Sequence, residues 1–249
     1  LRLNNTFKLV DYLTIESSIS YSLQEQVAPS KIGSVLTVCV PMPGLPLASL
    51  NGKSYAWGTW GSPVAKVSEG GDNRLSGSTF NVSETLSWVA TDWLTASVNL
   101  GYNTNIASRN QTENAITYYN YVGDTQVLVD PTQENSYYKQ TSSQTDFYSA
   151  TGFMNAHKRF NQKHDLSLTL CVQYEFKEYT YFGTMVKDVQ TGLEIVNGSG
   201  EITLSGDEDK YQNANMSYFG RFNYSYKDKY LLELNGRYVG SSIFQHQNR

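Results

Sequence analysis

The stretch "RFNYSYKDKYLLELNGRY", residues 221–238, alternates large apolar or aromatic side chains with polar ones. The apolar set is Phe222, Tyr224, Tyr226, Tyr230, Leu232, Leu234 and Tyr238, and the polar set is Arg221, Asn223, Ser225, Glu233, Asn235 and Arg237. Because successive side chains of a strand point to opposite faces, the pattern predicts a tight β-hairpin with one apolar and one polar face. A water-soluble sheet would bury the apolar face in a core, whereas a membrane barrel would turn it towards lipid.

The same alternation recurs three more times along the chain. The predicted hairpins span about 1–25, 78–104, 143–182 and 213–244, which makes about eight strands. Their short turns lie around Asp11, Asp92, Lys163 and Asp228. Glu84 interrupts the apolar face of the second hairpin. The repetition predicts an all-β, antiparallel, up-and-down arrangement.

The links between the predicted hairpins are long, at roughly 26–77, 105–142 and 183–212. Connections above about 15 residues are uncommon in compact domains, but outer-membrane barrels alternate short periplasmic turns with long extracellular loops. The alternation therefore favours a segment of a transmembrane β-barrel over a soluble β-sandwich. Even-numbered residues are then expected to face lipid from Phe80 onward. The polar residues expected to line the lumen are Arg221, Asn223, Glu233, Asn235 and Arg237.

Composition agrees with this class and excludes others. The chain has 249 residues, of which 39% are hydrophobic, and β-barrels leave little signal in such averages. The most apolar stretch, residues 34–47, is broken by Pro41, Pro43 and Pro46, so it cannot span a membrane as a helix. A net charge of -4 provides no basic field for nucleic acid. Cys39 and Cys171 fit neither a disulfide framework nor a zinc site, and free thiols and a bridge both remain open.

No catalytic, metal or cofactor site is expected. His157, His164 and His246 are scattered, and the acidic residues 207–209 lack the spacing of a dedicated calcium loop. Candidate ligand-binding residues are the aromatic residues of the long loops. They are Tyr55, Trp57, Trp60, Tyr118, Tyr119 and Tyr121. Such rings can stack on a sugar or a peptide, or they can pack the loops against one another.

The stretch "YFGRFNYSYKDKYLLELNGRYVGSSIF", residues 218–244, resembles the barrel of TonB-dependent transporters of the SusC/RagA type from Bacteroidetes. The matching residues are Arg221, Tyr224, Tyr226, Lys229, Tyr230, Leu231, Leu232, Arg237, Gly240, Ser241, Ser242 and Phe244. Val239 stands where the family usually has Asp. The segment "MPGLPLASLNGKSYAWGTWGSPVA" also looks like a stretch between early barrel strands of that family.

The resemblance implies consecutive strands of a larger, 22-stranded barrel, with no plug domain in this chain. It also implies an outer-membrane importer of oligosaccharides or peptides, powered by the TonB complex through parts absent from this chain. A SusD-like surface lipoprotein is the implied partner, and outer-membrane lipid surrounds the barrel. The alternative is a surface adhesin or carbohydrate-binding β protein without transport. A plug domain and a TonB-contact segment upstream of Leu1 would distinguish the two.

Overall fold

The computed structural model describes residues 1–37, 51–56, 61–127, 136–189, 202–204 and 209–244. Long strands dominate it. In chain order the elements are β1 (Arg2–Val10), β2 (Leu13–Pro29), α1 (Ile32–Thr37), β3 (Ser54–Tyr55), α2 (Pro63–Ser68), β4 (Asp72–Thr91), β5 (Leu94–Glu113), β6 (Tyr118–Tyr119), β7 (Gln126–Val127), β8 (Tyr137–Phe160), β9 (His164–Lys187), β10 (Ile202–Leu204), β11 (Asp209–Tyr226) and β12 (Tyr230–Ser241).

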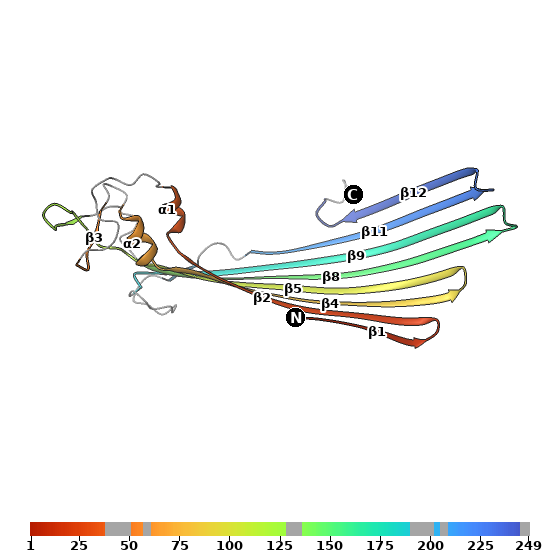
Figure 1. Ribbon diagram of the computed structural model, residues 1–249, viewed down its shortest axis with the longest axis horizontal. Coiled ribbons are helices and arrows are strands. Elements are labelled where there is room, and N and C mark those ends of the chain that lie inside the picture. The colour runs from red at the N-terminus through yellow and green to blue at the C-terminus, as the bar shows by residue number, and fades with distance from the viewer. Residues whose placement is uncertain (38–50, 57–60, 128–135, 190–201, 205–208, 245–249) are drawn as a thin grey trace.

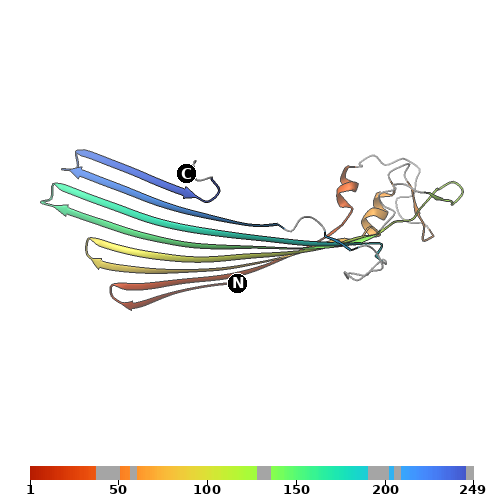
Figure 2. The ribbon, with the colours of Figure 1, turned by 180° about the vertical axis from the view of Figure 1, so that it is seen from behind.

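The long strands form one antiparallel sheet in the order β1-β2-β4-β5-β8-β9-β11-β12, and β10 adds to β9. Each long strand pairs with the next long strand of the chain, and the four hairpins are confirmed. The sheet is a single curved layer, with the short turns at one end and the helices at the other (Figures 1 and 2). In the described residues β1 does not pair with β12, so the sheet is open. The expected class, an antiparallel segment of a barrel wall, is confirmed.

The register keeps apolar and polar side chains on separate faces. One row across the sheet contains Ile15, Leu86, Val98, Gly152, Val172, Tyr218 and Tyr238. The adjacent row contains Glu16, Thr85, Asn99, Thr151, Gln173, Ser217 and Val239. Because a slip of one residue would exchange the faces, the hairpin turns and this pattern together fix the register. We refer to these two sides as the apolar face and the polar face.

The apolar face is not covered by any described element over the half of the sheet near the short turns (Figure 2). Leu100 and Leu234 remain 54% and 58% exposed. The buried apolar cluster of the described chain, Tyr138, Val186 and Val189, lies at the opposite end of the sheet. A soluble sandwich would bury this face against a second sheet, so the arrangement excludes the sandwich for the described residues.

Aromatic side chains border the apolar face at two levels. Tyr102, Tyr148 and Phe176 are neighbours in one row, with ring centroids 5.0 and 6.2 Å apart. Near the short turns lie His164 and Tyr224, whose hydroxyl is 2.7 Å from the imidazole Nδ1. On β5 the interval from Leu94 to Tyr102 covers about nine residues, the length that a tilted strand needs to cross a bilayer. Aromatic belts of this kind mark the two interfaces of a membrane protein.

A polar row interrupts the apolar face on the first three long strands. Asn5, Ser17 and Glu84 are successive partners across β1, β2 and β4. The Ser17 hydroxyl donates a hydrogen bond to the Glu84 carboxylate. This hydrogen bond offsets part of the free-energy cost of removing a polar group from water on an apolar surface. Glu84, which is expected to interrupt the apolar face, therefore has a hydrogen-bond partner in Ser17.

The strands extend further than the sequence predicts. The third hairpin is expected to cover 143–182, but β8 and β9 together run from Tyr137 to Lys187 and have 24 residues each. At about 3.3 Å per residue each strand is about 80 Å long, more than twice the length that crosses a bilayer. Much of the predicted loop sequence is therefore sheet that projects beyond the apolar band.

Two short helices and a small sheet lie beyond the end of the large sheet that is opposite the short turns (Figure 1), and the sequence predicts none of them. The small sheet has the order β3-β6-β7. Ser62 caps α2, since its hydroxyl accepts a hydrogen bond from the Ala65 amide at 3.4 Å, and Pro63 follows at the first helical position. Among the described residues, neither helix has the length and apolarity to cross a membrane.

Candidate functional site

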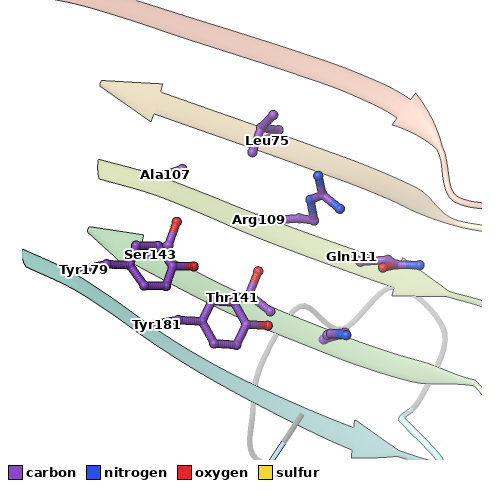
Figure 3. A pocket seen from close by; sticks show the side chains of 9 residues that line it. Leu75, Ala107, Arg109, Gln111, Thr141, Ser143, Tyr179 and Tyr181 are labelled. Carbon is purple, nitrogen blue, oxygen red and sulfur yellow. The ribbon is translucent and has the colours of Figure 1, made fainter. Parts of the chain in front are cut away.

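A pocket of about 260 Å³ lies on the polar face, in the part of the sheet beyond the apolar band. Four strands, β4, β5, β8 and β9, contribute its walls. The lining residues are Leu75, Ala107, Arg109, Gln111, Lys139, Thr141, Ser143, Tyr179 and Tyr181. Figure 3 shows the rings of Tyr179 and Tyr181 beside the hydroxyl-bearing side chains of β8, with Arg109 on the next strand. We refer to this site as the wall pocket.

Strand register brings these side chains together. Arg109 is the cross-strand partner of Thr141, and Gln111 is the partner of Lys139. Ser143 faces Tyr181 in the next pair. All six positions are odd-numbered on strands whose even-numbered residues form the apolar face. The wall pocket is therefore a product of side-chain alternation continued past the apolar band.

A row of aromatic rings extends the wall pocket towards β11. Tyr179 stacks on Tyr211 with ring centroids 5.0 Å apart and an interplanar angle of 28°. The Lys177 ammonium lies 5.6 Å from the centroid of the Tyr211 ring. Tyr211 is the cross-strand partner of Tyr179, and Asp209 is the partner of Tyr181. The rings form a flat surface with polar edges.

The charges around the wall pocket are unequal. Its lining contains two cations and no carboxylate. Among the residues that the structure describes, Arg109 and Lys139 have no hydrogen-bond or ion-pair partner. The carboxylate of Glu113, further along the polar face, accepts a 2.5 Å hydrogen bond from the Tyr137 hydroxyl and lies 3.7 Å from the Lys31 ammonium. Glu113 is therefore already paired with a cation outside the pocket.

Two of the acidic groups at a similar level lie on the opposite side of the sheet, whereas Asp209 shares the polar face with its cross-strand partner Tyr181. Glu178 is even-numbered and belongs to the apolar-face side, where its carboxylate is 2.9 Å from the Lys210 ammonium. Asp146 is its cross-strand partner and accepts a 2.8 Å hydrogen bond from the Tyr102 hydroxyl. The sheet thus separates these carboxylates from the free cations of the wall pocket.

Lys31 joins the first long connection to the sheet. It is 5% exposed, and its ammonium donates a 2.9 Å hydrogen bond to the Asn114 carbonyl besides pairing with Glu113. The neighbouring Ser30 hydroxyl donates to the Thr112 carbonyl at 2.6 Å, and its amide donates to the Gly71 carbonyl at 2.9 Å. This junction positions the helical segment at the end of β2, β4 and β5, next to the wall pocket.

Four of the six predicted loop aromatics lie in the small sheet and its turns, and Trp57 and Trp60 lie outside the described residues. Tyr55 and Tyr118 are buried, at 5% and 2% exposure, whereas Tyr121 is 50% exposed. Tyr55 and Tyr121 make an edge-to-face contact with centroids 5.4 Å apart. The Lys53 ammonium lies 5.0 Å from the centroid of the Tyr119 ring.

The small sheet and its turns, which we call the loop unit, contain hydrogen-bonded polar groups and, at Tyr118, a buried hydroxyl without a partner among the described residues. Hydrogen bonds from Lys53 and Tyr55 hold the pKa of the Asp124 carboxyl below its usual value. Burial raises the pKa of the Tyr118 hydroxyl. That hydroxyl has no hydrogen-bond partner in the described structure. Packing within the unit accounts for the burial of Tyr55 and Tyr118.

The predicted lumen-lining residues share the polar face of β11 and β12. Arg221 pairs with Asn235 and Asn223 pairs with Glu233 across the two strands. The Arg221 guanidinium donates to the Asn235 side chain at 3.0 Å, and the Asn235 amide donates to Glu233 at 2.6 Å. Arg237 lies on the same face, opposite Phe219. Three of the five therefore form a hydrogen-bonded network.

Other chemistry-bearing residues are dispersed. His157 contacts Asp165 at 2.8 Å near a short turn, far along the strands from the wall pocket. His246 and the acidic residues 207 and 208 lie outside the described residues. Cys171 is a free, half-buried thiol, and Cys39 also lies outside the described residues. The described part of the chain contains no group of three His, Cys, Asp or Glu residues that could hold a metal ion.

Comparisons with known proteins agree on the architecture. No protein-family model matches the chain. A stretch of 80 residues, 31% of this chain, is 41% identical to the TonB-dependent receptor P26 of Formosa agariphila and covers 8% of that protein. The whole chain superposes on a structure of the RagAB peptide transporter with a TM-score of 0.75 at 17% identity, and it covers 28% of that chain. The chain therefore has the fold of the barrel wall of RagAB, and part of its sequence is similar to a TonB-dependent receptor.

A second solved structure gives the same result for the fold. The chain matches the RagAB peptide importer in its open-open state with a TM-score of 0.74 and 17% identity, over 98% of this chain and 27% of that one. The fold that the resemblance implies is confirmed. The chain spans less than a third of the length of each of these proteins.

The wall pocket was not among the predicted sites. Arg109 and Lys139 fall within the stretch 105–142, which the sequence pattern predicts to be a loop. Lys177, Tyr179 and Tyr181 fall within the third predicted hairpin but were not singled out. The alternation of side chains could have located them. Cys171 is on the polar face, and the later odd-numbered residues of β9 on that face include Lys177, Tyr179 and Tyr181.

Proposed function

We propose that this chain forms part of the wall of an active outer-membrane importer. In this proposal the apolar face contacts lipid, and the polar face lines the lumen. The supporting observation is the wall pocket, a concave cationic and aromatic site on the polar face, just beyond an uncovered apolar band of membrane-spanning length. A pocket at this position would meet a ligand on its way from the extracellular side into the barrel.

The proposed ligand is an oligosaccharide or a peptide, and the proposed partners are a SusD-like surface lipoprotein and the TonB complex. The solved neighbour is named as a peptide transporter and as a peptide importer. Energy coupling would use parts of the transporter other than this wall. In the same proposal Arg221, Asn223, Glu233, Asn235 and Arg237 hydrate the lumen or contact a plug. Tyr119, Tyr121, Trp57 and Trp60 are proposed as outer ligand contacts, and Tyr55 and Tyr118 as support for them.

The competing function is surface binding without transport. An uptake assay distinguishes surface binding from transport. Cells that carry the full-length parent protein are given a fluorescein-labelled oligosaccharide or a fluorescein-labelled tetrapeptide. Uptake is measured with and without an uncoupler of the proton-motive force. Transport predicts internal label that the uncoupler abolishes while surface binding persists. We expect Tyr179→Ala with Tyr181→Ala to lower uptake about tenfold or more, since each lost ring contact is worth about 1 kcal/mol.

Matched controls keep this result specific. Tyr179→Phe with Tyr181→Phe retains the rings and should retain most of the uptake. Surface abundance, measured by antibody on intact cells, should be equal in all variants. Label that stays on the cell surface and does not respond to the uncoupler would assign the protein to the binding class instead.

A further inference from the structure

The wall pocket also indicates which ligand chemistry it accepts, and this inference rests on the proposed function. We infer that it binds an acidic oligosaccharide. Carboxylate or sulfate groups of the sugar pair with Arg109 and Lys139, and sugar rings stack on Tyr179 and Tyr181. The hydroxyls of Thr141 and Ser143 lie between the cations and the rings, where they can contact sugar hydroxyls.

The two cations of the wall pocket favour an anionic ligand. Two cations converge on one small pocket from adjacent strands, because Arg109 and Lys139 occupy neighbouring polar-face positions of β5 and β8. Neither has a partner in the described chain, whereas Lys31, Lys210 and Arg159 of the same molecule each pair with a carboxylate. Two like charges held close together repel, so an anion between them removes an unfavourable interaction. An arginine fork beside an ammonium suits a carboxylate or a sulfate group.

The row of tyrosine rings favours a sugar. Tyr179 and Tyr181 are two residues apart on one face of β9, which places their rings about 7 Å apart. Tyr211 continues the row by stacking on Tyr179. Polar-edged rings in a row present apolar surface to the faces of successive sugar units and hydroxyl groups to their rims.

The backbone argues against a peptide at this site. The residues of β5, β8 and β9 that line the wall pocket are each paired with neighbours on both sides, through β4, β5, β8, β9 and β11. The pocket therefore contains no free strand edge to which an extended peptide could add. Recognition must come from side chains alone. The volume of about 260 Å³ is near the lower limit for ligand sites, so one charged unit would occupy the pocket while its neighbours lie on the tyrosine row.

Calorimetry on the full-length parent protein in detergent tests this inference with four probes. They are tetragalacturonate, a sulfated carrageenan tetrasaccharide, neutral maltotetraose and tetraglutamate. We expect at least one of the two acidic sugars to bind at least tenfold more tightly than maltotetraose and tetraglutamate. The relative affinity of the carboxylated and sulfated sugars identifies the preferred anion. Raising the salt concentration from 50 to 500 mM should weaken binding of the acidic sugar only.

Variants assign the binding to the wall pocket. Arg109→Ala with Lys139→Ala should raise the Kd for the acidic sugar 10- to 100-fold, and Arg109→Lys with Lys139→Arg should restore most of the affinity. Arg74→Ala is the matched control, since Arg74 precedes Leu75 on β4 and points to the opposite face. Equal affinity for the acidic and neutral sugars, tighter binding of tetraglutamate, or no effect of the double variant would overturn the inference. Binding as inferred but without energy-dependent uptake would contradict the proposed transport and leave this site intact.

Discussion

Leu170→Arg is expected to lower the free energy of unfolding of the full-length barrel by about 2–4 kcal/mol, because it places a cation at the centre of the apolar band. Leu170 is midway along β9 between His164 and Phe176 and is 40% exposed. Its cross-strand neighbours on the apolar face are Met154 and Gly220, so the new guanidinium has no carboxylate beside it. Unfolding by guanidinium chloride in lipid vesicles, followed by tryptophan fluorescence, measures the change in the free energy of unfolding.

Gln173→Arg on the same strand is the control. Gln173 lies on the polar face between Thr151 and Ser217, and its amide donates a 2.8 Å hydrogen bond to Glu175. An arginine there can replace that bond and remain in water, so we expect little change in stability. Equal losses of stability in the two variants would mean that both faces are equally buried. That result would contradict the assignment of the apolar face to lipid and the polar face to water.

Lys31→Met is expected to release the first long connection from the sheet. The substitution leaves the Glu113 carboxylate with Tyr137 as its partner and removes the donor to the Asn114 carbonyl. Breaking a buried ion pair by removing one partner costs about 3–5 kcal/mol, and we expect a value near 3 because Glu113 is partly exposed. Amide hydrogen exchange in residues 30–37 and 61–71 should then accelerate about 100-fold.

Lys8→Met is the matched substitution for this test. Lys8 pairs with Asp11 at 3.0 Å, but the two side chains are 62% and 99% exposed. Exposed pairs contribute little to stability, so exchange should be unchanged throughout. If Lys31→Met left exchange at the junction unchanged, hydrogen bonds such as that from Ser30 to Thr112, rather than the charge, would hold the connection.

The sequence predicts the membrane-spanning half of the sheet well, for a clear physical reason. Between Leu94 and Tyr102, or Leu166 and Phe176, one face meets lipid in our assignment and the other meets water, so alternation appears directly in the residues. Beyond this band both faces are polar. In "NTNIASRNQTE", residues 103–113, the period disappears although the strand continues. The strand ends, and with them the wall pocket, therefore could not be located from alternation alone.

The loop unit was beyond prediction for a different reason. The small sheet consists of two-residue strands, including a parallel pair between Ser54–Tyr55 and Tyr118–Tyr119, which are far apart in the chain. Such pairs depend on tertiary contacts and leave no periodic signal. Helix α2 is an exception, since Ser62 and Pro63 form a recognisable helix start. The sequence predicts that Arg221, Asn235 and Glu233 share the polar face of one hairpin, and the register of that hairpin brings them into a hydrogen-bonded network.

Nitroxide accessibility in the full-length protein tests the assignment of faces most directly. Single labels would replace Leu168 and Leu232 on the apolar face, and Thr169 and Glu233 on the polar face, with the protein reconstituted in lipid vesicles. Our account predicts that the labels at 168 and 232 collide mainly with oxygen dissolved in the lipid, and that those at 169 and 233 collide mainly with a water-soluble nickel chelate. The reverse pattern would place the polar face outside and contradict the account.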